Sequence, residues 1–151
     1  MNIHFIKSSE KKKVISYLNS QFGIVNLPYL LIKSGKEKIR AYSGHLSKEE
    51  ILQLAQLTNI ETLGLYLMRK EHENDIRLTI DACHLLKDQI TKNTINISDE
   101  QLKEYLKGQN INIQAQQGNI IIKHNDDFIG GAKSNGEKVF NYVPKDRRLR
   151  K

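Results

Sequence analysis

The sequence has little cysteine and proline, and it has no long apolar run. Its 151 residues include one cysteine, Cys83, so no disulfide can form within the chain, as is typical of a reducing compartment. With two prolines and no long polar tract, disorder is disfavoured. There is no run of about 18 apolar residues for a membrane span, and residues 1–13 lack the apolar core of a signal peptide. We therefore expect a globular cytoplasmic protein without a membrane partner.

Positive charge is the main compositional feature. The chain has 24 Lys and Arg residues against 17 Asp and Glu residues, which gives a formal net charge of +7. An excess of this kind favours nucleic acid or another anionic surface as the partner. The alternative is that a small protein is basic without a specific reason.

The first hundred residues mix helical and extended patterns. Apolar spacing and caps predict a helix that starts with Ser9 at the N-cap and stops at Gly23, and a second that begins with the capping box Ser47 to Glu50. A further helical pattern covers residues 81–90. The strands predicted in this part are at residues 1–7, 29–32, 38–42, 61–70 and 76–80. Two of them, 29–32 and 38–42, should form a hairpin.

The last third is nearly all strand and turn. Residues 93–97 are expected to be a connector, and Ser98 to cap a short helix that ends at Gly108. From Gly118 to Lys151 three short strands are predicted, separated by turns at 125–127 and at Asn135-Gly136. The change of pattern places a domain boundary near the connector, which gives domains at residues 1–95 and 96–151.

Motifs for catalysis or metal binding are missing. Neither G-x-x-x-x-G-K-[ST] nor G-x-G-x-x-G occurs, and Gly130-Gly131 lies between strand patterns, which favours a packing turn or bulge over a nucleotide loop. The five histidines are scattered without metal-ligand spacing. Cys83 and His84 are neighbours on a predicted helix and point to different faces, so they do not pair as nucleophile and base. We therefore predict no catalytic residue, no cofactor and no metal.

The C-terminal segment concentrates the cations. From residue 133 onward there are seven cations against two acids, and Phe140 and Tyr142 lie among them. Aromatic faces stack on unpaired RNA bases, while Lys and Arg contact phosphates. The alternative is a frayed, solvated basic tail. The cations are Lys133, Lys138, Lys145, Arg147, Arg148, Arg150 and Lys151.

An ordered series of motifs in this segment resembles a known family. The motifs are Tyr105-Leu106-Lys107-Gly108, Gly118-Asn119-Ile120-Ile121-Ile122, Phe128-Ile129-Gly130-Gly131-Ala132-Lys133 and Asn141-Tyr142-Val143-Pro144-Lys145 followed by arginine. They resemble the PUA-like RNA-binding domain of RsmF-type rRNA 5-methylcytosine methyltransferases. Upstream, residues 75–80 resemble a stretch of the pre-PUA region. The two-part layout is also similar to that of Nip-type ribosome-biogenesis proteins and of standalone archaeal proteins of this kind.

The resemblance implies an α+β protein. A mixed α/β pre-PUA domain at 1–95 would precede a C-terminal PUA-like β-barrel with a basic tail at 96–151. The resemblance and the basic segment together give these candidate RNA-binding residues: Gly130, Gly131, Lys133, Lys138, Tyr142, Lys145, Arg147, Arg148 and Arg150. The two glycines would let an RNA backbone come close, because they have no Cβ.

The sequence departs from the family in two respects. The chain has no S-adenosylmethionine loop and no Pro-Cys or Thr-Cys motif, so methyltransferase activity does not carry over. It also has Gly-Gly-Ala where relatives often have Gly-x-Gly. The expected function is therefore binding of structured RNA, rRNA or tRNA, in ribosome biogenesis or RNA modification, without catalysis. The alternatives are a module that docks an acidic partner, such as a separate RNA methyltransferase or a ribosome-assembly factor, and an enzyme with an unrecognised site.

Overall fold

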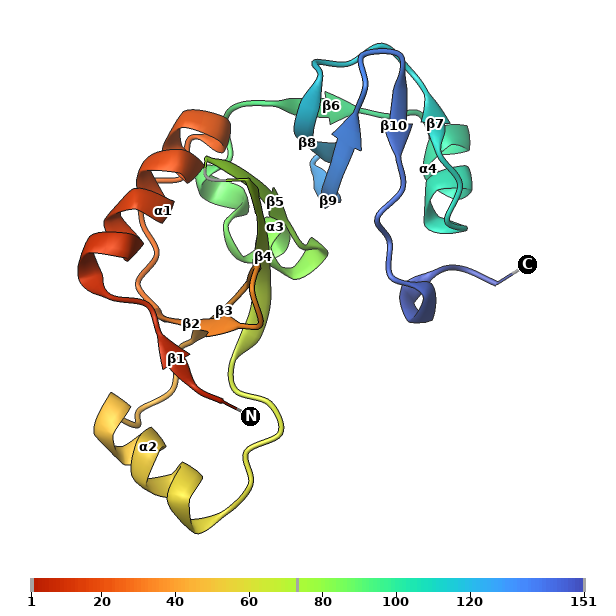
Figure 1. Ribbon diagram of the computed structural model, residues 1–151. Helices are drawn as coiled ribbons and strands as arrows, with labels where there is room; N and C mark the ends of the chain where they lie inside the picture. The colour runs from red at the N-terminus through yellow and green to blue at the C-terminus, as the bar shows by residue number, and fades with distance from the viewer. Residues whose placement is uncertain (1, 73, 151) are drawn as a thin grey trace.

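The computed structural model describes residues 2–72 and 74–150 (Figure 1). Two five-stranded sheets lie next to each other, with strand orders β1-β2-β3-β4-β5 and β6-β8-β9-β10-β7. Helices accompany both sheets, and the second sheet curls into a half-barrel, so the predicted α+β class is confirmed. Within the described residues no helix combines the length and the apolar character that crossing a membrane demands.

The N-terminal sheet is an antiparallel meander. Its strands are β1 (His4–Phe5), β2 (Leu30–Ser34), β3 (Lys38–Tyr42), β4 (Leu65–His72) and β5 (Asp75–Leu78). The β2–β3 hairpin pairs Leu30 with Tyr42 and Ser34 with Lys38, as predicted. The predicted edge strand is confirmed at β1, whereas Met1 lies outside the described residues. β4 begins later than expected because Gly64 adopts φ 76° just before it.

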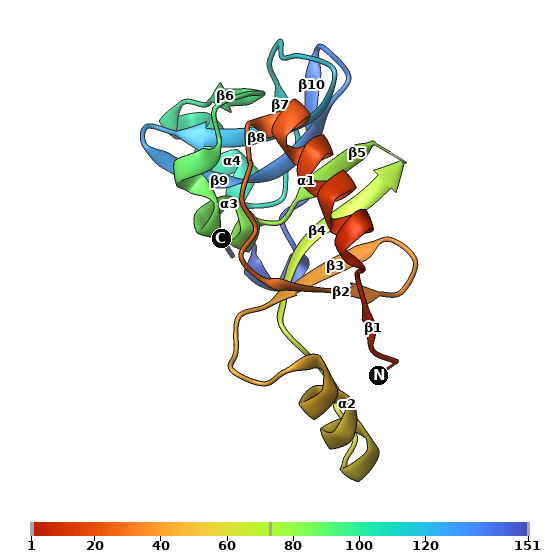
Figure 2. The same cartoon turned by 90° about the vertical axis from the view of Figure 1, so that its left-hand side faces the viewer.

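Two helices flank this sheet in different ways. α1 (Ser8–Phe22) buries Val14, Leu18 and Phe22 and ends at Gly23, which has φ 86°. Its N-cap is Lys7, so the prediction of Ser9 was wrong. α2 (Lys48–Leu57) begins with the predicted capping box but buries only Ile51, and it lies apart from both sheets (Figures 1 and 2).

α3 leads from the first sheet to the second. Thr79 caps it, because the Thr79 hydroxyl accepts a hydrogen bond from the Ala82 amide at 3.1 Å, and this cap ends β5 at Leu78. The helix predicted over 81–90 is in fact split into α3 (Ile80–Leu85) and the 3-10 turn η1 (Lys87–Gln89).

The C-terminal sheet contains one parallel pair. Its strands are β6 (Thr94–Asn96), β7 (Ile111–Asn112), β8 (Gly118–His124), β9 (Asp127–Ser134) and β10 (Lys138–Phe140). The connector expected at 93–97 therefore contains a strand, β6, which runs parallel to β8. The three strands and two turns predicted after Gly118 are confirmed. The expected helix is present as α4 (Asp99–Leu106), capped by Ser98, and the 3-10 turn η2 (Lys145–Arg147) lies near the C-terminus.

The two sheets share their cores. Ile120 and Ile122 lie in the core of the C-terminal sheet, whereas Ile121 packs with the N-terminal core. Successive side chains of a strand point to opposite faces, so β8 is covered by protein on both sides. The triple-isoleucine run thus joins the two halves into one packed body.

Candidate nucleic-acid interface

Two glycines set how closely the sheets meet. A Cβ on Gly131 would lie 2.2 Å from the Leu78 carbonyl oxygen, and one on Gly130 would lie 2.9 Å from Ile80 Cγ1. β9 can therefore lie directly on the end of β5. Both glycines follow a bulge at Ile129, where the register between β8 and β9 shifts. The close approach that the structure displays is between two strands of this chain.

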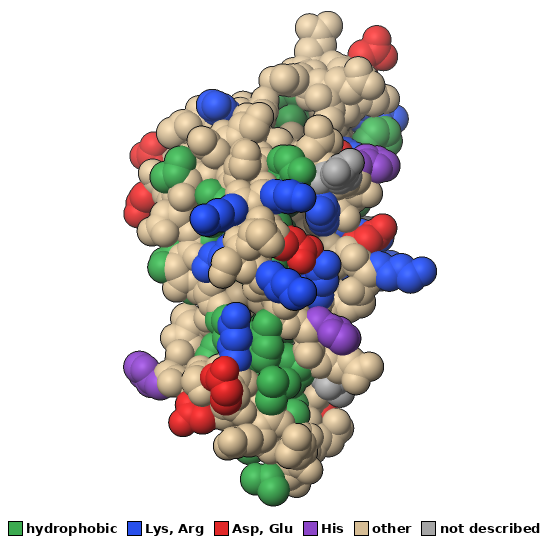
Figure 3. Space-filling view, turned by 60° about the vertical axis from the view of Figure 1, so that its left-hand side comes forward, with side chains coloured by type: hydrophobic (Ala, Val, Ile, Leu, Met, Phe, Trp, Pro, Cys, Tyr) green, Lys and Arg blue, Asp and Glu red, His purple; other side chains and the backbone are tan. Residues whose placement is uncertain are grey.

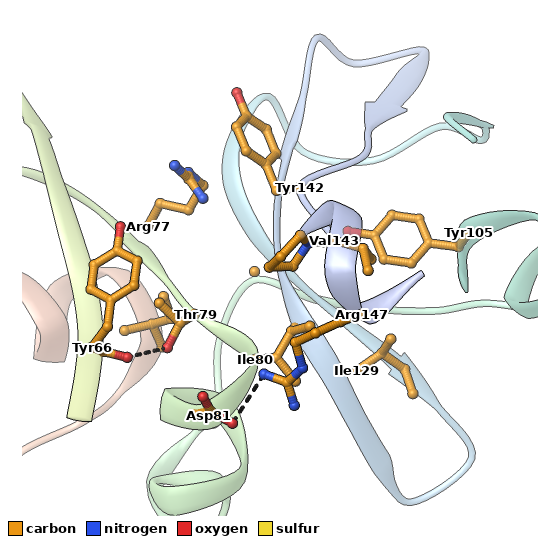
Figure 4. Close-up of a pocket in the computed structure, with 14 residues that line it drawn as sticks. Tyr66, Arg77, Thr79, Ile80, Asp81, Tyr105, Ile129, Tyr142, Val143 and Arg147 are labelled. Atoms are coloured by element: carbon orange, nitrogen blue, oxygen red, sulfur yellow. Dashed lines mark hydrogen bonds and ion pairs between the residues drawn. The ribbon is translucent and has the colours of Figure 1, made fainter. Parts of the chain in front are cut away.

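A cavity of about 110 Å³ opens along this contact, and we call it the junction cleft (Figure 4). Tyr66, Arg77 and Thr79 form one wall, from the N-terminal sheet. Tyr142, Val143 and Arg147 form the facing wall, from the segment after β10. The cleft is also lined by Ile80, Asp81, Gly130, Gly131 and Pro144. The cleft thus combines three tyrosines (Tyr105 is the third), two arginines and an apolar interior.

One carboxylate orients two cations at the cleft. Arg77 Nε donates to Glu71 Oε1 at 2.9 Å, and Lys133 Nζ is paired with Glu71 Oε2 at 2.5 Å. Burial alone would raise the pKa of Glu71, but hydrogen bonds from Lys133 and Arg77 outweigh it, so the pKa of this carboxyl is lowered. The pKa of Lys133 is raised by its hydrogen bond to Glu71. Glu71 and Lys133 therefore both stay charged near neutral pH.

Arg77 also lies on an aromatic ring from the segment after β10. Its guanidinium carbon is 4.0 Å from the centroid of Tyr142, which is a cation–π contact between the two halves. Only 13% of the Arg77 side chain is exposed, whereas Tyr142 is 38% exposed. Tyr142 therefore presents a ring surface at the mouth, with a guanidinium fixed beside it.

A side-chain network behind the cleft joins the sheets. Asn119 on β8 donates to Asp75 Oδ1 at 2.7 Å, and Gln21 at the end of α1 donates to the same oxygen at 3.2 Å. Asn119 Oδ1 is buried without a hydrogen-bond partner. Polar side chains from α1, β5 and β8 thus meet around one carboxylate and fix the orientation of β5.

The side chain of Asn141 makes several of the hydrogen bonds that hold the wall after β10. Asn141 Nδ2 donates to the carbonyls of Tyr105 at 2.6 Å and Gln109 at 2.9 Å, and Asn141 Oδ1 accepts from the Val143 amide. Tyr105 is buried and its side chain interacts with the backbone of Tyr142; burial raises its pKa to about 12. Asn141 thus explains physically why asparagine stands before the aromatic in this motif.

The predicted site residues divide into three groups. Gly130, Gly131, Tyr142 and Arg147 line the junction cleft. Lys133 adjoins it through Glu71. The others lie outside the lining: Lys138, Lys145 and Arg150 are exposed, Arg148 Nε donates to the Val143 carbonyl at 3.0 Å, and Lys151 is outside the described residues.

Sequence reasoning assigned no site role to the cleft residues of the N-terminal half. Tyr66, Arg77 and Asp81 belong to this group, and Arg147 Nη1 contacts Asp81 Oδ1 at 3.2 Å. Arg77 lies within the 75–80 stretch that resembles the pre-PUA region, which was the one available signal. Its position opposite Tyr142 depends on how the sheets pack, and strand periodicity does not contain that information.

Burial raises the pKa of the Cys83 thiol to about 12, so it remains protonated near neutral pH. Among the described residues no three His, Cys, Asp or Glu side chains are grouped so as to hold a metal ion.

Comparison with known families agrees with the C-terminal architecture. Residues 92–149 match the family model described as the methyltransferase RsmF PUA domain. The match supports the predicted resemblance to the PUA region of RsmF-type methyltransferases, and a PUA domain of this type points to RNA binding. It includes β6 at one end and the Tyr142–Arg147 wall of the cleft at the other. The family model that matches is that of a PUA domain and not that of a methyltransferase catalytic domain. No curated protein matches the chain.

Proposed function

We propose that the protein binds structured RNA, rRNA or tRNA, through the junction cleft and the cations around it, without catalysis of its own. One observation carries the proposal: at the border of the PUA domain, Arg77 is held by Glu71 against the ring of Tyr142. RNA recognition uses this combination, because rings and guanidinium planes stack on exposed bases while cations contact phosphates.

The surrounding cations supply the general affinity. Lys138, Lys145 and Arg150 are exposed on the C-terminal segment and would meet phosphates along the RNA. Arg148, which donates to the Val143 carbonyl, would contact the RNA backbone. Gly130 and Gly131 would lie beneath the RNA at the cleft. With a net charge of +7, binding should weaken steeply as salt rises.

Arg147 of the cleft wall and its exposed neighbour Lys145 give the cleanest test. Replacing Lys145 and Arg147 together by alanine should lower RNA affinity about tenfold in about 0.1 M salt, and should reduce the slope of log affinity against log salt by about 2. Loss of Arg147 also leaves the Asp81 carboxylate unpaired near the phosphates. Filter binding or fluorescence anisotropy with a tRNA and an rRNA fragment measures both quantities.

The matched control replaces two other exposed lysines, Lys36 and Lys87, which do not line the cleft. It removes the same charge and should change affinity by less than about threefold. Equal losses in the two double variants would mean that net charge alone drives binding. Unchanged affinity in the cleft variant would refute the site.

We infer that the biological setting is ribosome biogenesis or RNA modification in the cytoplasm. RNA crosslinking followed by sequencing of the bound fragments tests this directly. Recovery of rRNA or tRNA positions next to modified nucleotides supports it, whereas recovery of mRNA alone contradicts it.

A second candidate function is an accessory module for a separately encoded RNA methyltransferase. α2 favours it, because Leu52, Leu54 and Leu57 are exposed on a helix that lies apart from both sheets, and Leu57 is 85% exposed. Co-purification with a methyltransferase should survive nuclease treatment and should be lost with Leu54→Ser and Leu57→Ser. Loss of the complex on nuclease treatment would leave RNA as the link between the two proteins.

A further inference from the structure

The junction cleft has the chemistry of a receptor for one planar ring. Its interior is apolar at Ile80 and Val143, its mouth carries the rings of Tyr66 and Tyr142, and one edge carries the Asp81–Arg147 ion pair (Figure 4). Ligand sites commonly combine an apolar interior with a few converging polar groups. The polar pair here offers an acceptor and a donor next to each other.

The volume limits what can enter. The cleft measures about 110 Å³, and an engineered cavity of about 150 Å³ holds one benzene ring. The cleft is smaller than that cavity, so a single-ring base would enter only in part, with the rest of the ring at the opening. A ribose and a phosphate would remain outside, on the protein surface.

Cations are placed where that outer part would lie. Lys38 Nζ is 5.3 Å from the centroid of Tyr66 on one wall, and the Arg77 guanidinium is fixed over Tyr142 on the other. A nucleotide whose base enters the cleft would therefore have positive charge on both sides of its phosphates. Arg77 is already paired with Glu71, but an aromatic side chain from a protein partner would bring no negative charge to Lys38, so the arrangement favours a nucleotide.

We propose that the junction cleft accepts one unpaired nucleobase of the bound RNA, stacked on Tyr66, with the sugar–phosphate backbone outside. The inference rests on the proposed function and deepens it, because it identifies the recognised feature as a bulged or loop nucleotide. Bases within a continuous duplex are stacked and paired, so only an extruded base can enter. Asp81 then accepts from an N–H group on the base edge, and Arg147 donates to a carbonyl on the same edge or to the flanking phosphate.

The experiment compares three RNA hairpins that differ at one position. The first has a single bulged nucleotide, the second has an abasic residue in its place, and the third has a continuous stem. Wild-type protein should bind the bulged hairpin about five- to tenfold more tightly than the other two, which is the lower end of the range expected for one base–aromatic stack. Tyr66→Ala should remove the preference, whereas Tyr66→Phe should keep it, because the ring remains.

A second measurement follows the base itself. With 5-fluorouridine as the bulged nucleotide, its fluorine NMR resonance should shift when wild-type protein binds, because the base lies on a tyrosine ring, and should shift much less with Tyr66→Ala. An unchanged resonance on binding, or equal affinity for the bulged and abasic hairpins, overturns the base receptor and leaves RNA binding intact. Failure to bind all three hairpins and cellular tRNA overturns the proposed function, and the base receptor with it.

Discussion

Two groups of cations differ in how the fold holds them. At the junction cleft, Arg77 and Lys133 share one carboxylate and Arg77 lies on an aromatic ring. On α1, Lys12 and Lys13 project into solvent, and Figure 3 shows basic side chains gathered across the middle of the face that α1 helps to form. Lys11 is a partial exception, since it donates to the Tyr29 carbonyl at 2.7 Å; burial and the nearby Lys48 lower its pKa.

The comparison shows that charge density alone does not identify a binding site. An orientated guanidinium beside a ring loses little freedom when a ligand arrives, whereas a free lysine must be immobilised. We therefore expect the cleft to recognise RNA geometry and the α1 surface to contribute only weak, general attraction. Variants that remove contacts holding the cleft should therefore have larger effects than variants that remove the free lysines.

Gly131→Ala should disturb the cleft most. Gly131 does not have a positive φ, so the cost arises from the contact of the new Cβ with the Leu78 carbonyl, where the distance would be 2.2 Å. β9 and β5 must move apart, which should lower the free energy of unfolding by about 3 kcal/mol. RNA affinity should also fall, because both walls of the cleft depend on this contact. Urea denaturation and anisotropy measure the two effects.

The control is Gly35→Asn in the β2–β3 turn. Gly35 has φ 69° and open space around its Cβ position, and asparagine tolerates this conformation. It should cost less than about 1 kcal/mol and leave RNA binding unchanged. Equal stability of the Gly131→Ala and wild-type proteins would show that the sheets do not need the close contact.

Asn141→Ala should have the next largest effect. It removes two donated hydrogen bonds and one accepted bond, which should cost about 2 kcal/mol and free the segment that carries Tyr142 and Arg147. RNA affinity should fall although no RNA-facing side chain has changed. Thermal unfolding and RNA titration measure the two effects, and replacing the exposed Asn59 by alanine is the control. Full RNA affinity in the variant would mean that the hydrogen bonds of Asn141 are not needed to hold the Tyr142–Arg147 wall in place.

Local signals in the sequence predicted much of the fold but only half of the cleft. The β2–β3 hairpin, the capping box at Ser47, the cap at Ser98 and the strands after Gly118 follow from nearest-neighbour chemistry. β6 was missed because its three residues become a strand only by pairing with β8. Tyr66 and Arg77 were missed for the same reason, since their role arises from contact between sheets. Gly131 was singled out correctly as a packing glycine, but the strand against which it packs could not be identified.

Glu71→Gln should have a smaller effect that depends on pH. Because the pKa of Glu71 is lowered in the folded protein, its carboxylate stabilises the fold above the ordinary value of 4.5, and this contribution is lost as pH falls through the folded-state pKa. The variant should be about 1 kcal/mol less stable at pH 7. Urea denaturation at pH 7 and below pH 4 should show the gap closing in acid.

Glu10→Gln supplies the contrast from the α1 side. Glu10 pairs with Lys33 at 2.7 Å, but both side chains are about one-third exposed or more, so the loss should be below about 0.5 kcal/mol. If Glu71→Gln and Glu10→Gln lowered the free energy of unfolding equally, the ion pairs at the cleft would be no stronger than an exposed ion pair of α1.

The smallest effect should come from replacing Lys12 and Lys13 together by alanine. Both lysines lie in the first two turns of α1, where positive charge opposes the helix dipole, so stability should stay the same or rise by up to about 0.5 kcal/mol. RNA affinity should fall by less than about threefold, and the salt slope should stay within about 0.5 of the wild-type value, because neither lysine would contact a phosphate directly. If the slope instead falls by about 2, both lysines contact phosphates, and the RNA must then extend from the cleft around the N-terminal sheet to the face that carries α1. Anisotropy titrations over a range of salt concentrations decide between these outcomes, with the Lys145→Ala and Arg147→Ala double variant measured alongside.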